Sequence, residues 1–147
     1  MSLLEEIRKD MLTALKSGKK SKSQTLKMLV ASIKNAQIES EKELSDKEIE
    51  KILRKETKKI DDSIEQYQKM GRDDLVKKEK QDLEIIEEYL PDLMSNDDIK
   101  KVVEKKIEQL GASDIRDMGK VMGAVMKDLE DKADGNTVKN IVQSMLV

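Results

Sequence analysis

Apolar residues recur at intervals of three and four along almost the whole 147-residue chain. This spacing places them on one face of an α-helix, and no segment of useful length alternates between apolar and polar residues as a half-buried strand would. Aromatic residues make up only 1% of the chain, all of them tyrosine. The sequence therefore predicts an all-α fold whose core is built from leucine, isoleucine, valine and methionine.

Local signals predict about four helices in the first part of the chain. Ser2 and Ser45 are each followed three residues later by glutamate, which is the capping-box pattern at the start of a helix. Glycines after the apolar stripes mark helix ends. We expect helices over residues 2–17, from 21–23 to about 38, 45–70 and 73–90.

Pro91 interrupts this pattern. The residue before a proline avoids the helical region, so Leu90 should end a helix and a domain. Three shorter helices are expected afterwards: one from Ser95 to Gly111, one from Asp114 to Leu129, and one after the turn at 131–135. The sequence thus predicts an N-terminal helical domain over residues 1–91 and a small three-helix C-terminal domain over residues 92–147.

Composition excludes several kinds of chemistry. Without cysteine or histidine, the chain has no thiolate nucleophile, no imidazole base and no zinc site of the usual type. It also lacks the glycine-rich loops that bind nucleotide phosphates. We expect no catalytic residue, no metal site and no cofactor, although 31 acidic residues leave carboxylate chemistry formally open.

The sequence also bears on location. The chain contains no run of 18 apolar residues, so no membrane span is predicted. The first helix carries Glu5, Glu6 and Asp10 and so lacks the apolar centre of a signal peptide. The absence of cysteine excludes a disulfide framework. We expect a cytoplasmic protein with no membrane partner.

A cationic stretch is hidden by the net charge of −2. Residues 11–38 contain no aspartate or glutamate, in a chain that is otherwise rich in acids. Uncompensated positive charge attracts a polyanion, and nucleic-acid phosphate is the polyanion that we expect here. Alternatively, acids from another helix neutralise these lysines. The stretch carries Lys16, Lys19, Lys20, Lys22, Lys27 and Lys34, and we take the first five as candidate RNA-binding residues.

The helix expected before Leu129 contains Gly119 and Gly123, with Lys120 between them. Glycine in a helix interior costs about 1 kcal/mol relative to alanine, so two glycines on one face indicate the close approach of another backbone. That backbone could belong to a neighbouring helix, with Met118, Met122 and Met126 as flexible core filler. It could instead belong to a nucleic acid lying against Gly119, Lys120 and Gly123.

The turn at 132–135 leads into the last helix. It places Lys132 beside a helix N-terminus at about Asn136, where free backbone N–H groups attract anions. The alternative is an ordinary connection in which Asp134 or Asn136 caps the helix. Lys132 and Asn136 complete the candidate RNA-binding residues.

Three segments in this order resemble the GatB/YqeY family: Tyr89-Leu90-Pro91, Met118-Gly119-Lys120-Val121-Met122-Gly123 and Lys132-Ala133-Asp134-Gly135. The resemblance is to the free-standing YqeY-like members and covers essentially the whole chain. It implies an all-helical fold with a small three-helix C-terminal domain. In the amidotransferase B subunit this module is a tail that contacts tRNA, and the amide-transferring active site lies in a separate, larger domain.

Together, these features predict a non-catalytic helical module that binds tRNA or a tRNA-processing enzyme such as an amidotransferase or synthetase. Two tyrosines offer little stacking surface for single-stranded bases, so recognition would use shape and phosphate. A protein–protein adaptor without RNA contact is an alternative. A further alternative, implied by the family resemblance alone, is carbon–nitrogen ligase activity with glutamine as the amide donor.

Overall fold

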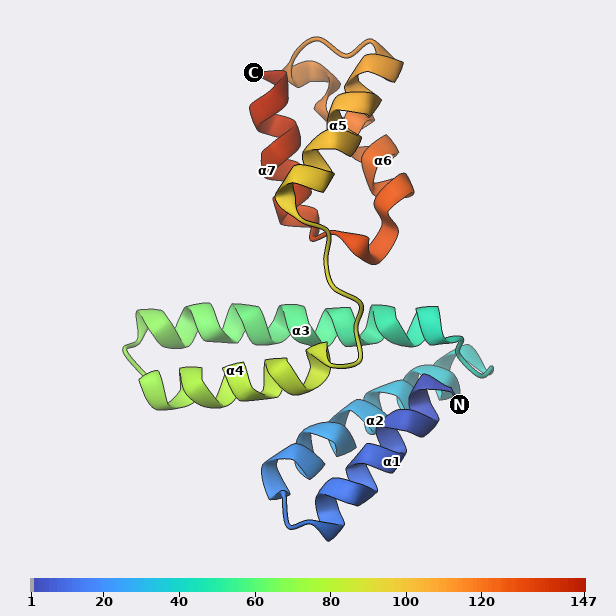
Figure 1. Cartoon of the computed structure of the whole chain (residues 1–147), viewed down its shortest axis with the longest axis vertical. Coiled ribbons are helices and arrows are strands. Elements are labelled where there is room, and N and C mark those ends of the chain that lie inside the picture. Colours follow the sequence, from blue (N-terminus) through green and yellow to red (C-terminus); the bar gives the residue numbers. More distant parts are fainter. Residues whose placement is uncertain (1) are drawn as a thin grey trace. The chain divides into compact units, whose positions relative to one another are not determined.

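The computed structural model describes residues 2–147, and every regular element within that range is helical (Figure 1). The elements are α1 (Leu3–Lys16), α2 (Lys20–Ser40), α3 (Asp46–Lys69), α4 (Asp73–Glu87), α5 (Asn96–Leu110), the 3₁₀ helix η1 (Ile115–Asp117), α6 (Met118–Leu129), the 3₁₀ helix η2 (Glu130–Lys132) and α7 (Gly135–Leu146). No strand occurs among the described residues. The all-α prediction is confirmed. The chain divides into two compact units, one up to Leu90 and one from Pro91.

The first unit is made of two helical hairpins, α1 with α2 and α3 with α4 (Figure 1). Each helix turns its apolar stripe inward, and burial of such a stripe supplies most of a helix's stability in a protein. The core is entirely aliphatic, with Leu26, Leu29, Ile33 and Leu53 fully buried at its centre.

Polar contacts between distant residues join the two hairpins. The Thr25 hydroxyl on α2 donates to the Asp82 carboxylate on α4 at 3.0 Å. The Tyr89 hydroxyl donates to the Asp10 carboxylate on α1. The Thr25–Asp82 bond sets a side of α2 against α4, and the Tyr89–Asp10 bond joins α1 to the residues that follow α4.

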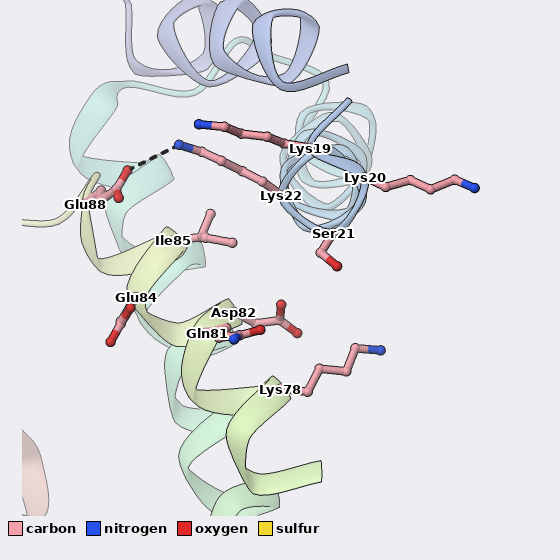
Figure 2. A pocket seen from close by; sticks show the side chains of 10 residues that line it. All are labelled: Lys19, Lys20, Ser21, Lys22, Lys78, Gln81, Asp82, Glu84, Ile85 and Glu88. Carbon is pink, nitrogen blue, oxygen red and sulfur yellow. Dashed lines mark ion pairs between the residues drawn. The ribbon is translucent and has the colours of Figure 1, made fainter. Parts of the chain in front are cut away.

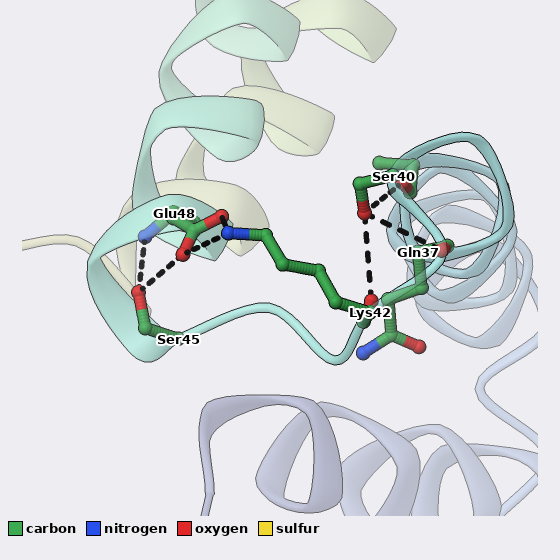
Figure 3. A network of polar contacts seen from close by, with 6 residues as sticks. Gln37, Ser40, Lys42, Ser45 and Glu48 are labelled. Atoms are coloured by element: carbon green, nitrogen blue, oxygen red, sulfur yellow. Dashed lines mark hydrogen bonds and ion pairs between the residues drawn. The ribbon is translucent and has the colours of Figure 1, made fainter.

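The connection between α2 and α3 is organised by a small polar network (Figure 3). The Ser45 hydroxyl accepts from the Glu48 backbone N–H at 3.2 Å, as the capping pattern predicts. The Glu48 carboxylate lies 3.4 Å from the Lys42 ammonium. Partial burial raises the pKa of Glu48, but Lys42 and Ser45 outweigh this effect and leave the pKa below its usual range. The Lys42 ammonium therefore already has an ion-pair partner, Glu48, within the fold.

The second unit packs α5, α6 and α7 around a valine-rich core that includes Val103, Val121, Val125 and Val142. The methionines of α6 at positions 118, 122 and 126 are partly buried against this core. The methionine stripe is therefore packing, which the flexible, unbranched side chain suits.

Helix α4 begins at Asp73 as expected, although Arg72 at its N-cap provides no side-chain cap. One helix start differs from the sequence prediction. The segment from Asp114 is a 3₁₀ turn followed by α6 rather than one helix. There the Asp114 carboxylate accepts from the Arg116 N–H and caps the short turn instead.

Candidate nucleic-acid interface

The lysines of the acid-free stretch lie on the α1–α2 hairpin, and most of them are free. Lys16, Lys19, Lys20 and Lys27 are exposed, and among the described residues no carboxylate forms an ion pair with any of them. Neutralisation by another helix applies only to Lys22, whose ammonium is 4.0 Å from the Glu88 carboxylate. The alternative of a neutralised patch therefore fails for four of the five candidates.

A cavity of about 520 Å³ lies between the start of α2 and α4 (Figure 2). Its α2 side carries Lys19, Lys20, Ser21 and Lys22, and its α4 side carries Lys78, Gln81, Asp82, Glu84, Ile85 and Glu88. In Figure 2, Lys19 runs alongside Lys22 toward Glu88, whereas Lys20 points the opposite way. The cavity thus has walls of mixed charge. The free positive surface is the one that Lys20 faces.

The glycines of α6 lie on an open face. Gly119 and Gly123 are exposed, and a Cβ added to either would meet no atom within 4 Å. Close helix packing therefore does not explain them. Lys120 is exposed beside them, and no carboxylate among the described residues pairs with it.

Sequence reasoning missed one member of this face. Lys127 lies four residues after Gly123 and is also exposed without an ion pair to any described residue. The neighbouring acid, Asp128, is held by Lys106 at 2.8 Å. The four-residue spacing from Gly119 through Gly123 was the signal that could have identified Lys127.

The turn before α7 is a poorer anion-binding site than the sequence suggests. The Asp134 carboxylate caps the helix, accepting from the Thr137 N–H and from its hydroxyl, both at 3.0 Å. A carboxylate thus occupies the position where a phosphate would bind near Asn136, which is exposed in the first turn. Lys132 is exposed, and its carbonyl accepts from the Met94 N–H at 2.8 Å. Asn136 therefore has no role in the interface that we propose below.

Among the side chains that the structure describes, no cluster of three or more acidic groups is placed to hold a metal ion. Within the same residues, no helix is both long enough and apolar enough to cross a membrane.

Known proteins resemble this chain along most of its length. The family model described as Yqey-like protein matches residues 4–146. An uncharacterized protein of Schizosaccharomyces pombe is 34% identical over 90 residues, which are 61% of this chain and 73% of that protein. Two proteins named "Altered inheritance of mitochondria protein 41, mitochondrial" are each 26% identical. The one from Pyrenophora tritici-repentis aligns over 98% of this chain and 81% of its own length, and the one from Clavispora lusitaniae over 99% and 85%.

These names contradict the cytoplasmic location expected from the sequence, because two relatives that match nearly the whole chain are mitochondrial by name. The expectation rested on the missing apolar centre of a secretory signal. That feature separates secreted from non-secreted proteins and does not distinguish the cytoplasm from an organelle.

The resemblance drawn from three short segments is confirmed for the YqeY family. Because the family model extends from residue 4 to residue 146, the protein belongs to the YqeY family.

Proposed function

We propose that this protein is a non-catalytic helical module that binds RNA, with transfer RNA as its ligand. The observation that carries the proposal is the acid-free stretch of residues 11–38, in which Lys16, Lys19, Lys20 and Lys27 are exposed without an ion pair to any described residue. Unpaired cations gain the most from neutralising phosphate, because no intramolecular ion pair must be broken first.

The open face of α6 supports the same proposal. Gly123 lies in the interior of α6 and lowers the stability of the helix, and packing within the chain does not offset this cost, because a Cβ there would meet no atom within 4 Å. A smooth surface flanked by Lys120 and Lys127 lets a phosphate backbone approach the helix closely. Phosphate contacts of this kind position a nucleic acid without reading its sequence.

A titration of the full chain with fluorescently labelled tRNA at two salt concentrations tests the proposal. We expect Lys120→Glu to weaken binding and to lower the salt dependence by about one phosphate contact. Lys101→Glu is the matched control, because Lys101 is an exposed lysine on α5 of the same unit. If wild-type protein fails to bind tRNA at low salt, the proposal is wrong. If it binds tRNA and both variants bind equally, the face of α6 takes no part in the contact.

A protein–protein adaptor is the second candidate, and exposed leucines favour it. Leu12 and Leu15 on α1 are 51% and 63% exposed, and RNA binding has no need for such apolar surface. An apolar protein complex would survive high salt, whereas phosphate binding weakens steeply with salt. The same salt series on any isolated complex therefore separates the two functions.

A further inference from the structure

Three lysines of α2 form a straight row along its exposed side. Lys20, Lys27 and Lys34 are seven residues apart, and all three are exposed. At a rise of 1.5 Å per residue, neighbouring members are about 10.5 Å apart and the row is about 21 Å long. Seven residues fall about 20° short of two full turns, so the three side chains leave the helix in nearly the same direction. We call these three residues the α2 lysine row.

The α2 lysine row is not neutralised by ion pairs within the described residues, although Lys20 also lines the cavity against α4. No carboxylate among the described residues pairs with any of its members. The positions between them on the same side are Gln24 and Ala31, both uncharged and exposed. Figure 2 shows Lys20 pointing away from Lys22 and Glu88, so the row is separate from that ion pair.

Helix α2, which carries the row, is fixed by contacts on its opposite side. Leu26, Leu29 and Ile33 on its opposite side are fully buried in the core, and Thr25 is bonded to Asp82 on α4. The row therefore keeps its spacing before any ligand binds, and little conformational entropy of the backbone is lost on binding.

A rigid, straight row of cations suits a polyanion whose phosphates are themselves regularly placed. A duplex meets this condition. A single strand binds best where aromatic side chains stack on its bases, and neither tyrosine is free for this role. Tyr67 packs against the core, and the Tyr89 hydroxyl donates to Asp10.

Building on the proposed RNA-binding function, we propose that α2 lies along the phosphate backbone of a double-stranded RNA stem. Lys20, Lys27 and Lys34 each contact a phosphate of that stem. The ligand of this surface is thus helical RNA recognised by its backbone, and base sequence contributes nothing to the contact.

The test compares two triple variants of the full chain. The first is Lys20→Gln with Lys27→Gln and Lys34→Gln. The control is Lys51→Gln with Lys55→Gln and Lys58→Gln, which removes the same charge from three exposed lysines of α3. Lysine and glutamine have similar helix propensities, so both variants should fold like the wild type by circular dichroism.

The probes are a blunt-ended RNA duplex, a single-stranded oligouridylate and tRNA, titrated over a range of salt concentrations. We expect the wild type and the α3 control to bind the duplex more tightly than the single strand. The α2 triple variant should lose this preference, and its slope of log affinity against log salt should fall by about 2.7, or 0.9 for each lysine.

The outcomes separate the two proposals. If the α2 triple variant binds the duplex with wild-type affinity and slope while Lys120→Glu weakens tRNA binding, the α2 proposal is overturned and the proposed function stands. A wild type that prefers the oligouridylate also overturns it. Should the wild type bind neither tRNA nor duplex, but bind vesicles containing phosphatidylglycerol, both proposals are wrong and the surface is one for lipid.

Discussion

Two glutamates have a positive φ, Glu41 at 56° and Glu130 at 49°, and Glu41 lies in the left-handed helical region. Residues with a Cβ rarely adopt this region, because the Cβ approaches the carbonyl oxygen. Glu41 is the C-cap of α2, the position that glycine usually fills in this conformation. The end of α2 therefore carries local strain that comes from residue choice rather than from packing.

Replacing Glu41 by glycine should relieve this strain. We expect Glu41→Gly to raise the free energy of unfolding by about 0.5–1 kcal/mol. The left-handed conformation costs a residue with a Cβ roughly 1–2 kcal/mol, and the greater freedom of glycine in the unfolded chain offsets about 0.5–1 kcal/mol of the gain. Urea denaturation followed by circular dichroism measures the change. Glu43→Gly is the control, because Glu43 is an exposed residue of the same connection whose φ is not positive. A loss of stability in Glu41→Gly comparable to that of the control would contradict the prediction.

Tyr89 should make stability depend on pH in alkaline solution. Burial raises the pKa of its hydroxyl, and the bond to Asp10 raises it further. In the unfolded chain the hydroxyl ionises near pH 10, whereas in the folded protein it keeps its proton. The contribution of Tyr89 is thus fully present below about pH 10 and is lost as the pH rises above that value.

The measurement compares wild type with Tyr89→Phe by urea denaturation from pH 8 to pH 11. At pH 8 the variant should be less stable by about 1–3 kcal/mol, because it leaves the Asp10 carboxylate without this hydrogen bond. Above pH 10 the difference should shrink, since only the wild type carries the titrating hydroxyl. A difference that stays constant over the whole range would show that Tyr89 does not titrate in this way.

At the scale of single helices, α6 is less stable than it could be. Gly123 lies in the interior of the helix, and a Cβ there would meet no atom within 4 Å. We expect Gly123→Ala to stabilise the C-terminal unit by up to about 1 kcal/mol, because alanine is the better helix former and nothing is overpacked. Thermal denaturation measures this gain. Destabilisation would instead show that the glycine face is packed.

At the scale of the whole molecule, two cores are built from separate parts of the chain. One cluster of buried residues extends from Leu3 to Leu90, and the other from Ile99 to Leu146. Each unit therefore has its own source of hydrophobic stability, and units of this kind can open independently.

Hydrogen exchange tests this division. Val125 is fully buried in the second core, so we expect Val125→Ala to weaken amide protection throughout α5, α6 and α7. Truncating a buried aliphatic side chain costs about 2–4 kcal/mol through lost burial and the cavity left behind. Protection of α3, which belongs to the first core, should stay at its wild-type level. An equal loss of protection in α3 would mean that the two units unfold together.

The sequence by itself determined the helical class and several helix starts. Ser2, Ser45 and Ser95 cap the helices that their local patterns predict, because a cap joins residues only three positions apart. The acid-free stretch and its lysines could also be identified from the sequence, since charged residues can be counted along the chain. The start of α6 was harder to foresee, because Asp114 caps a short 3₁₀ turn and the α-helix begins only at Met118.

Tertiary structure decided which of these residues remain available to a ligand. Lys22 and Lys20 are indistinguishable by type, yet Lys22 lies beside Glu88, 66 positions further along the chain, and Lys20 faces solvent. The sequence left two explanations for Gly119 and Gly123, and only the packing of α6 shows that their face is open. Such outcomes depend on contacts between segments far apart in sequence. Periodicity specifies which face of a helix is buried, but not which neighbour covers the rest of it.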